Sequence, residues 1–276
     1  MPVHLGSMSE SVRAVLRARR DSLKPGDAVA LNNPYNGGTH LPDVTVIMPV
    51  FGDDGRLVFL TGARAHHADI GGITPGSMPP DSVHIDQEGV LFDDFTLMEH
   101  GRLKEDALRA LLASGPYPAR NPDQNVADLQ AQIAACHKGA QAILAMVEQF
   151  GLEVVQAYMR HVQANAAEQV RRVVDRLHDG TFTYANDMGD EIRVAVTVDR
   201  ERRRARIDFT GTSAQGQHNF NCPAAVTRAA VLYVFRTLVE ADIPLNEGCL
   251  EPLDLVIPAG ALINCTWPAA CCAGNV

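Results

Sequence analysis

The stretch that decides how the first part of this chain folds is Val44-Thr45-Val46-Ile47-Met48-Pro49-Val50-Phe51, followed by Asp53-Asp54-Gly55 and Leu57-Val58-Phe59-Leu60. Two apolar runs flank an acidic turn that ends in glycine, which is typical of a β-hairpin. A long loop rich in glycine and proline lies on each side of the hairpin, at residues 32–42 and 68–80. If residues 44–51 pair with residues 57–64, both loops lie at the same end of the hairpin.

The remainder of the chain combines helices and strands without a regular βαβ alternation. Residues 9–24 predict a helix capped by Ser9, and residues 28–31 predict a short strand. Apolar residues spaced by three and four from Val126 to Leu177, interrupted at Gly151, predict two long helices. We expect these helices to pack as an antiparallel hairpin that serves as a scaffold or a subunit interface.

After residue 181 the pattern returns to strands. Residues 192–198 and 205–209 are expected to pair, residues 223–240 to form a helix and residues 253–257 a strand. The basic run Arg202-Arg203-Arg204 is more typical of a solvated hairpin tip than of a phosphate site. This order favours an α+β fold with a strand-rich region at 1–118, a helical hairpin at 119–180 and an α+β region at 181–276.

Composition excludes several classes of protein. The 276 residues, 46% hydrophobic and 21% charged, can bury a core and are too apolar for wholesale disorder. No membrane span or signal peptide is visible, which favours a cytoplasmic protein. A net charge of -9 without a basic block argues against a nucleic-acid partner. The six cysteines form no C-x-x-C pair, so we expect reduced and mostly buried thiols.

The two loops beside the hairpin carry nearly all of the unusual polar residues. They are Asn33-Pro34-Tyr35-Asn36-Gly37-Gly38-Thr39-His40-Leu41-Pro42-Asp43 and Ala65-His66-His67-Ala68-Asp69-Ile70-Gly71-Gly72-Ile73-Thr74-Pro75-Gly76. Strand pairing would bring His66 beside His40 and Asp43. Neutral imidazole and carboxylate suit Zn, Mn or Fe, and three protein ligands leave the open positions of a catalytic metal.

Each of these residues also has a purely structural interpretation. A single His-x-x-Asp is a weak signal, His66 and His67 could be a surface pair, and Asp69 could be a turn residue before two glycines. The convergence of two glycine-rich, proline-stiffened loops on one hairpin favours a metal or acid/base site. Spacing alone leaves these alternatives open.

These loop motifs strongly resemble the hydantoinase B/5-oxoprolinase family. The resemblance extends over essentially the whole chain. It also includes residues 2–8, 120–132, 208–213, 221–224 and 243–249.

The resemblance implies a B-type subunit of an ATP-dependent hydantoinase or 5-oxoprolinase. Its partner would be an A-type ATPase subunit that phosphorylates the oxygen of a small cyclic amide, which fits the lack of a Walker-type loop here. The B-type unit would complete ring opening by metal-assisted attack of water. The alternatives are a ketone carboxylase subunit on the same scaffold, and a non-catalytic scaffold that binds the A-type subunit through residues 123–178.

The resemblance also implies roles for individual residues. His40, Asp43 and His66 would hold the divalent metal. His67 and Asp69 would lie behind the ligands or face the substrate, and our hypothesis is that one of them acts as base or orients the water. The candidates for binding the anionic oxygen are the backbone amides of Gly37, Gly38, Gly71 and Gly72.

Two features depart from the family pattern. Asn33 stands where members often have Asp, and the acidic candidate ligand that members carry upstream of the first motif is missing. Typical members are also longer, and residues 273–276 lie inside what resembles a continuing motif. We therefore expect a fragment of a larger subunit.

Overall fold

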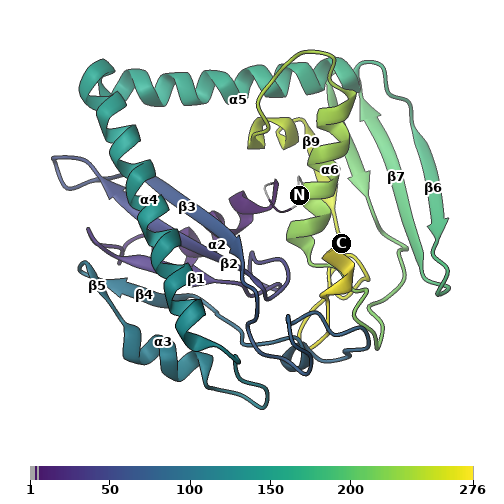
Figure 1. The fold of residues 1–276 in the computed structure, drawn as a ribbon. Coiled ribbons are helices and arrows are strands. Elements are labelled where there is room, and N and C mark those ends of the chain that lie inside the picture. Colours follow the sequence, from purple (N-terminus) through teal and green to yellow (C-terminus); the bar gives the residue numbers. More distant parts are fainter. Residues whose placement is uncertain (1–3, 5, 276) are drawn as a thin grey trace.

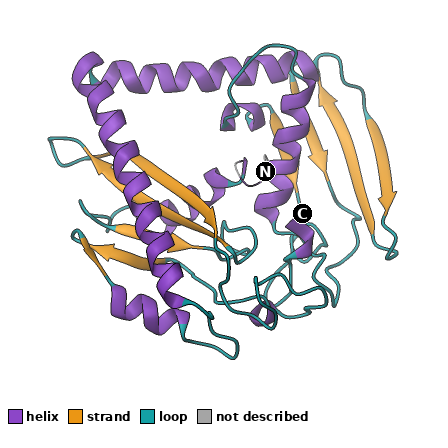
Figure 2. Ribbon diagram, in the orientation of Figure 1, coloured by secondary structure: helices purple, strands orange, loops and turns teal. Residues whose placement is uncertain are grey.

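The computed structural model describes residues 4 and 6–275, so the positions 2, 3 and 5 of the first motif and residue 276 lie outside the described residues. Figures 1 and 2 show two β-sheets on opposite sides of the molecule, with helices between and beside them. The fold is α+β, as predicted. The elements are α2 (Met8–Arg19), β1 (Ala28–Leu31), β2 (Asp43–Phe51), β3 (Leu57–His66), η1 (Ile85–Gln87), β4 (Phe95–Glu99), β5 (Arg102–Leu103), α3 (Glu105–Leu112), α4 (Pro122–Phe150), α5 (Leu152–Val174), β6 (Gly180–Ala185), β7 (Glu191–Asp199), β8 (Arg204–Asp208), α6 (Ala224–Leu238), η2 (Glu247–Leu250), β9 (Leu253–Val256) and η3 (Ala273–Asn275).

The first sheet is antiparallel, with strand order β3-β2-β1-β4-β5. Successive residues of a strand point to opposite faces. Val29 and Leu31 of β1 therefore pack with α2, whereas Ala28 and Ala30 join the core that α3 and α4 complete. Because both faces of β1 and β2 are covered, these strands consist almost entirely of apolar residues.

The predicted β-hairpin is confirmed. β2 and β3 pair antiparallel from Asp43 opposite His66 to Phe51 opposite Leu57. The turn between them contains Gly55 with a φ of 75°, a conformation that glycine adopts without a steric penalty. The register brings the ends of the two long loops together, which is the geometry that the site requires.

The two long helices are also present, but the expected antiparallel packing is wrong. Figure 1 shows α4 and α5 meeting at a corner near Gly151, where the backbone leaves the helical conformation. The first half of α4 packs on the first sheet through residues such as Leu129 and Ile133. The last turns of α5 pack with the second sheet through Val170 and Val174. The apolar stripe thus serves two different cores instead of one shared seam.

The second sheet has the order β6-β7-β8-β9, with β8 parallel to β9. Its strands β7, β8 and β9 and the helix α6 lie close to the bounds expected from the sequence. Ile207 of β8, Leu232 of α6 and Val170 of α5 belong to one buried cluster. The sheet is therefore covered by α6 and by the end of α5.

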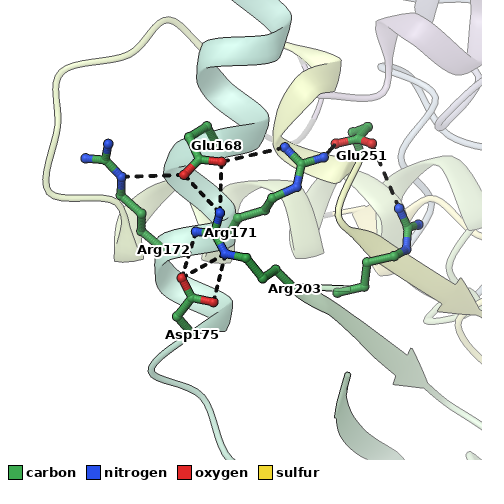
Figure 3. Close-up of polar contacts among 7 residues, drawn as sticks. Glu168, Arg171, Arg172, Asp175, Arg203 and Glu251 are labelled. Atoms are coloured by element: carbon green, nitrogen blue, oxygen red, sulfur yellow. Dashed lines mark hydrogen bonds and ion pairs between the residues drawn. The ribbon is translucent and has the colours of Figure 1, made fainter. Parts of the chain in front are cut away.

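Ion pairs connect the end of α5 to the turn between β7 and β8. Figure 3 shows Arg203 between Glu168 and Asp175, with nitrogen–oxygen distances of 3.1 and 2.7 Å. Arg204 pairs with Asp254 at 2.7 Å. Such exposed pairs contribute little individually. The basic run lies at a hairpin tip, as predicted, and two of its three arginines have close acidic partners.

The helix α2 is shorter than expected, and Ser9 does not cap it. The helix begins at Met8, and the Ser9 hydroxyl donates a hydrogen bond to Glu247 at 2.7 Å. The N–H groups of Ser22 and Leu23 both bond to the carbonyl of Arg19, which closes the helix in a turn before residue 24.

The cysteines are mostly buried, as expected from the sequence. All six cysteines are free, and only Cys222 is not fully buried. Across residues 4 and 6–275, none of the helices combines the length and apolarity needed to cross a bilayer.

Candidate metal centre

The loop at residues 32–42 is held in a fixed shape by the side-chain amides of its first two residues. The side chain of Asn32 donates to the carbonyls of Leu41 and Val90, at 2.8 and 3.0 Å. The side chain of Asn33 accepts from the N–H of Tyr35 at 2.9 Å, which makes an Asx turn. Asn33 therefore has a structural role, and the loop delivers His40 and Asp43 to the end of β2.

Of the three ligands implied by the family resemblance, His40 and Asp43 belong to a tight group of possible ligand atoms, and His66 lies beside that group. Asp43 and His66 are opposite each other in the β2–β3 register. Nδ1 of His40 lies 3.7 Å from Oδ2 of Asp43, and the rings of His40 and His66 are 5.0 Å apart between centroids. His40 and Asp43 are buried, whereas His66 is exposed. The cluster therefore has a buried floor and one side open to solvent.

A third imidazole, which the sequence did not single out as a ligand, joins the cluster. Nε2 of His4 lies 3.3 Å from Oδ2 of Asp43, and its ring stacks on that of His40 at 5.3 Å. One ligand atom from each of His4, His40 and Asp43 lies within 4.8 Å of the others. The only sequence signal was the position of His4 in the first family motif.

Burial favours the neutral form of two imidazoles of the cluster, those of His40 and His4. Burial lowers the pKa of His40 to about 4, although the nearby Asp43 carboxylate opposes that shift. Burial also lowers the pKa of His4, again against the effect of Asp43. A neutral imidazole has a free nitrogen lone pair, which is the form that binds metals.

The donor set fits a divalent metal. Nε2 of His4 and Nδ1 of His40 are buried without a hydrogen-bond partner, which is unusual for polar atoms in a protein interior. Both nitrogens face the same carboxylate oxygen, which also accepts a hydrogen bond from Thr39 at 3.1 Å. Two imidazole nitrogens and one carboxylate are suitable ligands for Zn, Mn or Fe.

His67 points away from this cluster. It is fully buried, with Nε2 3.1 Å from Oε1 of Gln132 and Nδ1 3.0 Å from Nδ2 of Asn125. Both ring nitrogens are therefore occupied by α4 side chains. These contacts do not fit the role of general base expected from the sequence, and they indicate that His67 fastens the loop to α4.

Asp69 is also committed to internal contacts. Its carboxylate accepts hydrogen bonds from the backbone N–H groups of Gly71, Gly76 and Arg120 and from the Arg120 guanidinium, at 2.8–3.1 Å. Burial alone would raise the pKa of Asp69, but these donors hold the pKa below its usual value. A carboxylate so stabilised is a weak base, so the expected role as base does not fit Asp69 either.

Replacing Asp69 with Asn is expected to weaken folding. Loss of the charge-assisted bonds should lower the free energy of unfolding by about 1–2 kcal/mol at neutral pH. Because the pKa of folded Asp69 lies below its ordinary value of 3.8, the contribution of Asp69 to stability is complete above that pH and is lost as the pH falls through the folded pKa. Urea unfolding at several pH values checks this: the difference between wild type and variant should shrink in acid, and a constant difference would contradict it.

Most of the glycine N–H groups that were expected to bind an anionic oxygen already donate hydrogen bonds within the protein. The N–H of Gly38 donates to Asn33 at 2.7 Å, and the N–H of Gly72 donates to Tyr117 at 3.0 Å. The N–H of Gly71 is one of the donors to Asp69.

Close packing explains why these positions are glycine. A Cβ at Gly38 would lie 2.3 Å from the carbonyl oxygen of Asn32. Gly37 and Gly72 have φ values of 84° and 87°, and a Cβ on either would lie 2.6 Å from a backbone oxygen. The amides of Gly38, Gly71 and Gly72 are thus structural, and the expected role in substrate binding does not fit them.

Comparison with known proteins supports this fold and these motifs. The whole chain, residues 1–276, matches the family described as hydantoinase B/oxoprolinase. It is 44% identical over 301 residues to 5-oxoprolinase 1 of Arabidopsis thaliana, covering all of this chain and 24% of that protein. The crystal structure of ATP-dependent caprolactamase from Pseudomonas jessenii is similar with a TM-score of 0.83 at 26% identity, over 97% of this chain and 46% of that chain. The nucleotide-free structure of acetone carboxylase shares the fold with a TM-score of 0.79 at 20% identity, over 99% of this chain and 38% of that one.

The chain therefore belongs to the hydantoinase B/oxoprolinase family, as its loop motifs predicted. It spans about a quarter of the length of the Arabidopsis relative and less than half of the caprolactamase chain.

Proposed function

We propose that this chain is the metal-binding part of a B-type subunit that opens small cyclic amides, such as hydantoins or 5-oxoproline. An A-type ATPase partner first phosphorylates the amide oxygen, and the B-type subunit completes hydrolysis of the activated ring. The names of the relatives support the substrate class, because they include a 5-oxoprolinase and an ATP-dependent caprolactamase.

The observation that carries this proposal is the cluster of buried, unpaired ligand atoms around Asp43. His40, Asp43 and His66 would hold a divalent metal at the open end of the β2–β3 hairpin. When bound, such a metal supplies a Lewis acid and lowers the pKa of water so that hydroxide is available near neutral pH.

The protein's own residues prepare this site. Thr39 donates to Asp43 and fixes the orientation of the carboxylate. Burial keeps His40 neutral and therefore ready to bind the metal at physiological pH. His66 is the exposed member, so the substrate enters on its side. An amide carbon is a poor electrophile because of resonance, and phosphorylation of its oxygen by the partner removes that protection.

The proposal places the subunit in the cytoplasm. Its partner consumes ATP, and six free cysteines suit a reducing compartment.

The test is ATP-dependent turnover by the complete subunit together with its A-type partner. We expect hydantoin or 5-oxoproline to be opened with stoichiometric formation of ADP, and no ring opening without ATP. A parallel assay offers a ketone with bicarbonate. Bicarbonate-dependent loss of the ketone without lactam turnover would contradict the proposal and indicate a ketone carboxylase. Copurification of both subunits without turnover of any substrate would instead indicate a non-catalytic scaffold that binds the A-type subunit.

A further inference from the structure

The surroundings of His4 differ from those of an ordinary surface histidine. His4 lies just before α2, and its side chain is only 15% exposed. Its Nε2 is buried and without a hydrogen-bond partner, although Oδ2 of Asp43 is 3.3 Å away. An unpaired nitrogen in this environment loses its solvation without recovering it elsewhere.

The backbone at His4 is held in place by a half-buried arginine. The Ser7 hydroxyl donates to the carbonyl of His4 at 2.9 Å, and the Arg64 guanidinium donates to the same carbonyl. Arg64 also bonds to the hydroxyls of Ser7 and Ser11, at 2.6 and 2.8 Å. β3 therefore anchors the segment before α2, and the anchor directs the His4 ring at the cluster.

A simple His–Asp pair elsewhere in the chain shows what is different here. Nε2 of His218 lies 3.4 Å from Oδ2 of Asp190, at 21% exposure. There, Nδ1 of the histidine accepts from the N–H of Phe220, and no other candidate metal ligand completes a tight group among the described residues. At His4, by contrast, a second buried imidazole faces the same carboxylate oxygen. Two lone pairs and a carboxylate converging in one buried place are best satisfied by a cation.

We propose that His4 is a direct ligand of the divalent metal, together with His40 and Asp43, and that His66 completes the set from the exposed side. The inference rests on the metal site of the proposed function and adds a ligand to it. A set of three imidazoles and one carboxylate is rich in nitrogen, which disfavours Ca or Mg. Fe or Mn would keep positions open for water beside these four ligands, and Zn would do so by expanding to five ligands.

Metal binding tests this without any assay of activity. Zn²⁺ and Co²⁺ dissociation constants are measured for the wild type and for His4→Ala, with His4→Gln as a second variant of similar size. Loss of one ligand should raise the dissociation constant by at least the roughly 10–100-fold that outer-shell partners contribute. His218→Ala is the matched control, because it removes a His–Asp pair of nearly the same length outside the cluster. Far-UV circular dichroism verifies that each variant is folded.

A substitution that creates a new ligand gives a direct spectroscopic signal. In His4→Cys loaded with Co²⁺, a thiolate-to-metal charge-transfer band should appear that is lacking in the wild type and in His218→Cys. No band, with His4→Ala and His4→Gln binding metal as tightly as the wild type, would overturn the assignment of His4. If His40→Ala and Asp43→Ala still lost the metal, the proposed function would stand. If the wild type bound no stoichiometric metal, both proposals would fall.

Discussion

Asp43→Ala should abolish ring opening by the complete subunit and its partner, with a loss of about 10³-fold or more. A bound metal supplies several kcal/mol of stabilisation in such reactions, and each 1.36 kcal/mol corresponds to about a factor of ten in rate. Asp43 is the central carboxylate of the cluster, since His4 and His40 both face its Oδ2. Its removal therefore leaves the remaining imidazoles without a charged ligand.

The measurement is lactam hydrolysis followed together with metal content. Asp54→Ala is the control, because Asp54 lies at the opposite end of the same hairpin and pairs with Arg56 in solvent. We expect Asp54→Ala to keep both metal and activity. Full metal content in Asp43→Ala, or unimpaired turnover without metal, would contradict the proposed role of the cluster.

Gly71→Ala is expected to cause the largest loss of stability. Gly71 has a φ of 95°, and a Cβ there would lie 2.3 Å from the carbonyl oxygen of Tyr117 and 2.9 Å from the carbonyl carbon of Pro118. Both neighbours are backbone atoms, which cannot move aside like a side chain. Strain in the left-handed region and overpacking together should lower the free energy of unfolding by about 3–5 kcal/mol.

Gly115→Ala separates these two contributions. Gly115 has a φ of 77°, but a Cβ there meets nothing within 4 Å. Only the conformational cost remains, about 1–2 kcal/mol. Urea unfolding of both variants measures the difference. Equal destabilisation of the two variants would show that the contact with residues 117 and 118 contributes nothing to the loss of stability.

Local patterns predicted the hairpin and the meeting of the proposed ligands. The apolar runs and the acidic turn of residues 44–60 fix the pairing, and strand register then places His66 opposite Asp43. The predicted bounds of β1, β7, β8 and α6 were close for the same reason, since each has a clear periodicity between turn residues.

Features that depend on tertiary packing were not visible in the sequence. The spacing of apolar residues in α4 and α5 shows that each helix has a buried face, but not which partner covers it. A glycine-rich loop can free its amides for a ligand or use them internally, and Gly38 and Gly72 use theirs internally. The roles of His67 and Asp69 depended on contacts with residues of α4 and its preceding loop, more than fifty positions away.

His4 was missed because it is far from the two loops in sequence. Its place in the cluster depends on the half-buried guanidinium of Arg64, which fixes the segment before α2. No local spacing rule connects these positions, so only the folded structure brings them together.

An anomalous diffraction map of crystals grown with Zn²⁺ or Mn²⁺ tests the metal site directly. We expect one strong peak within bonding distance of Asp43 Oδ2 and the unpaired nitrogens of His4 and His40, with His66 turned toward it. A map without a peak at this end of the hairpin, or with the metal bound elsewhere while activity is retained, would contradict the proposed metal site.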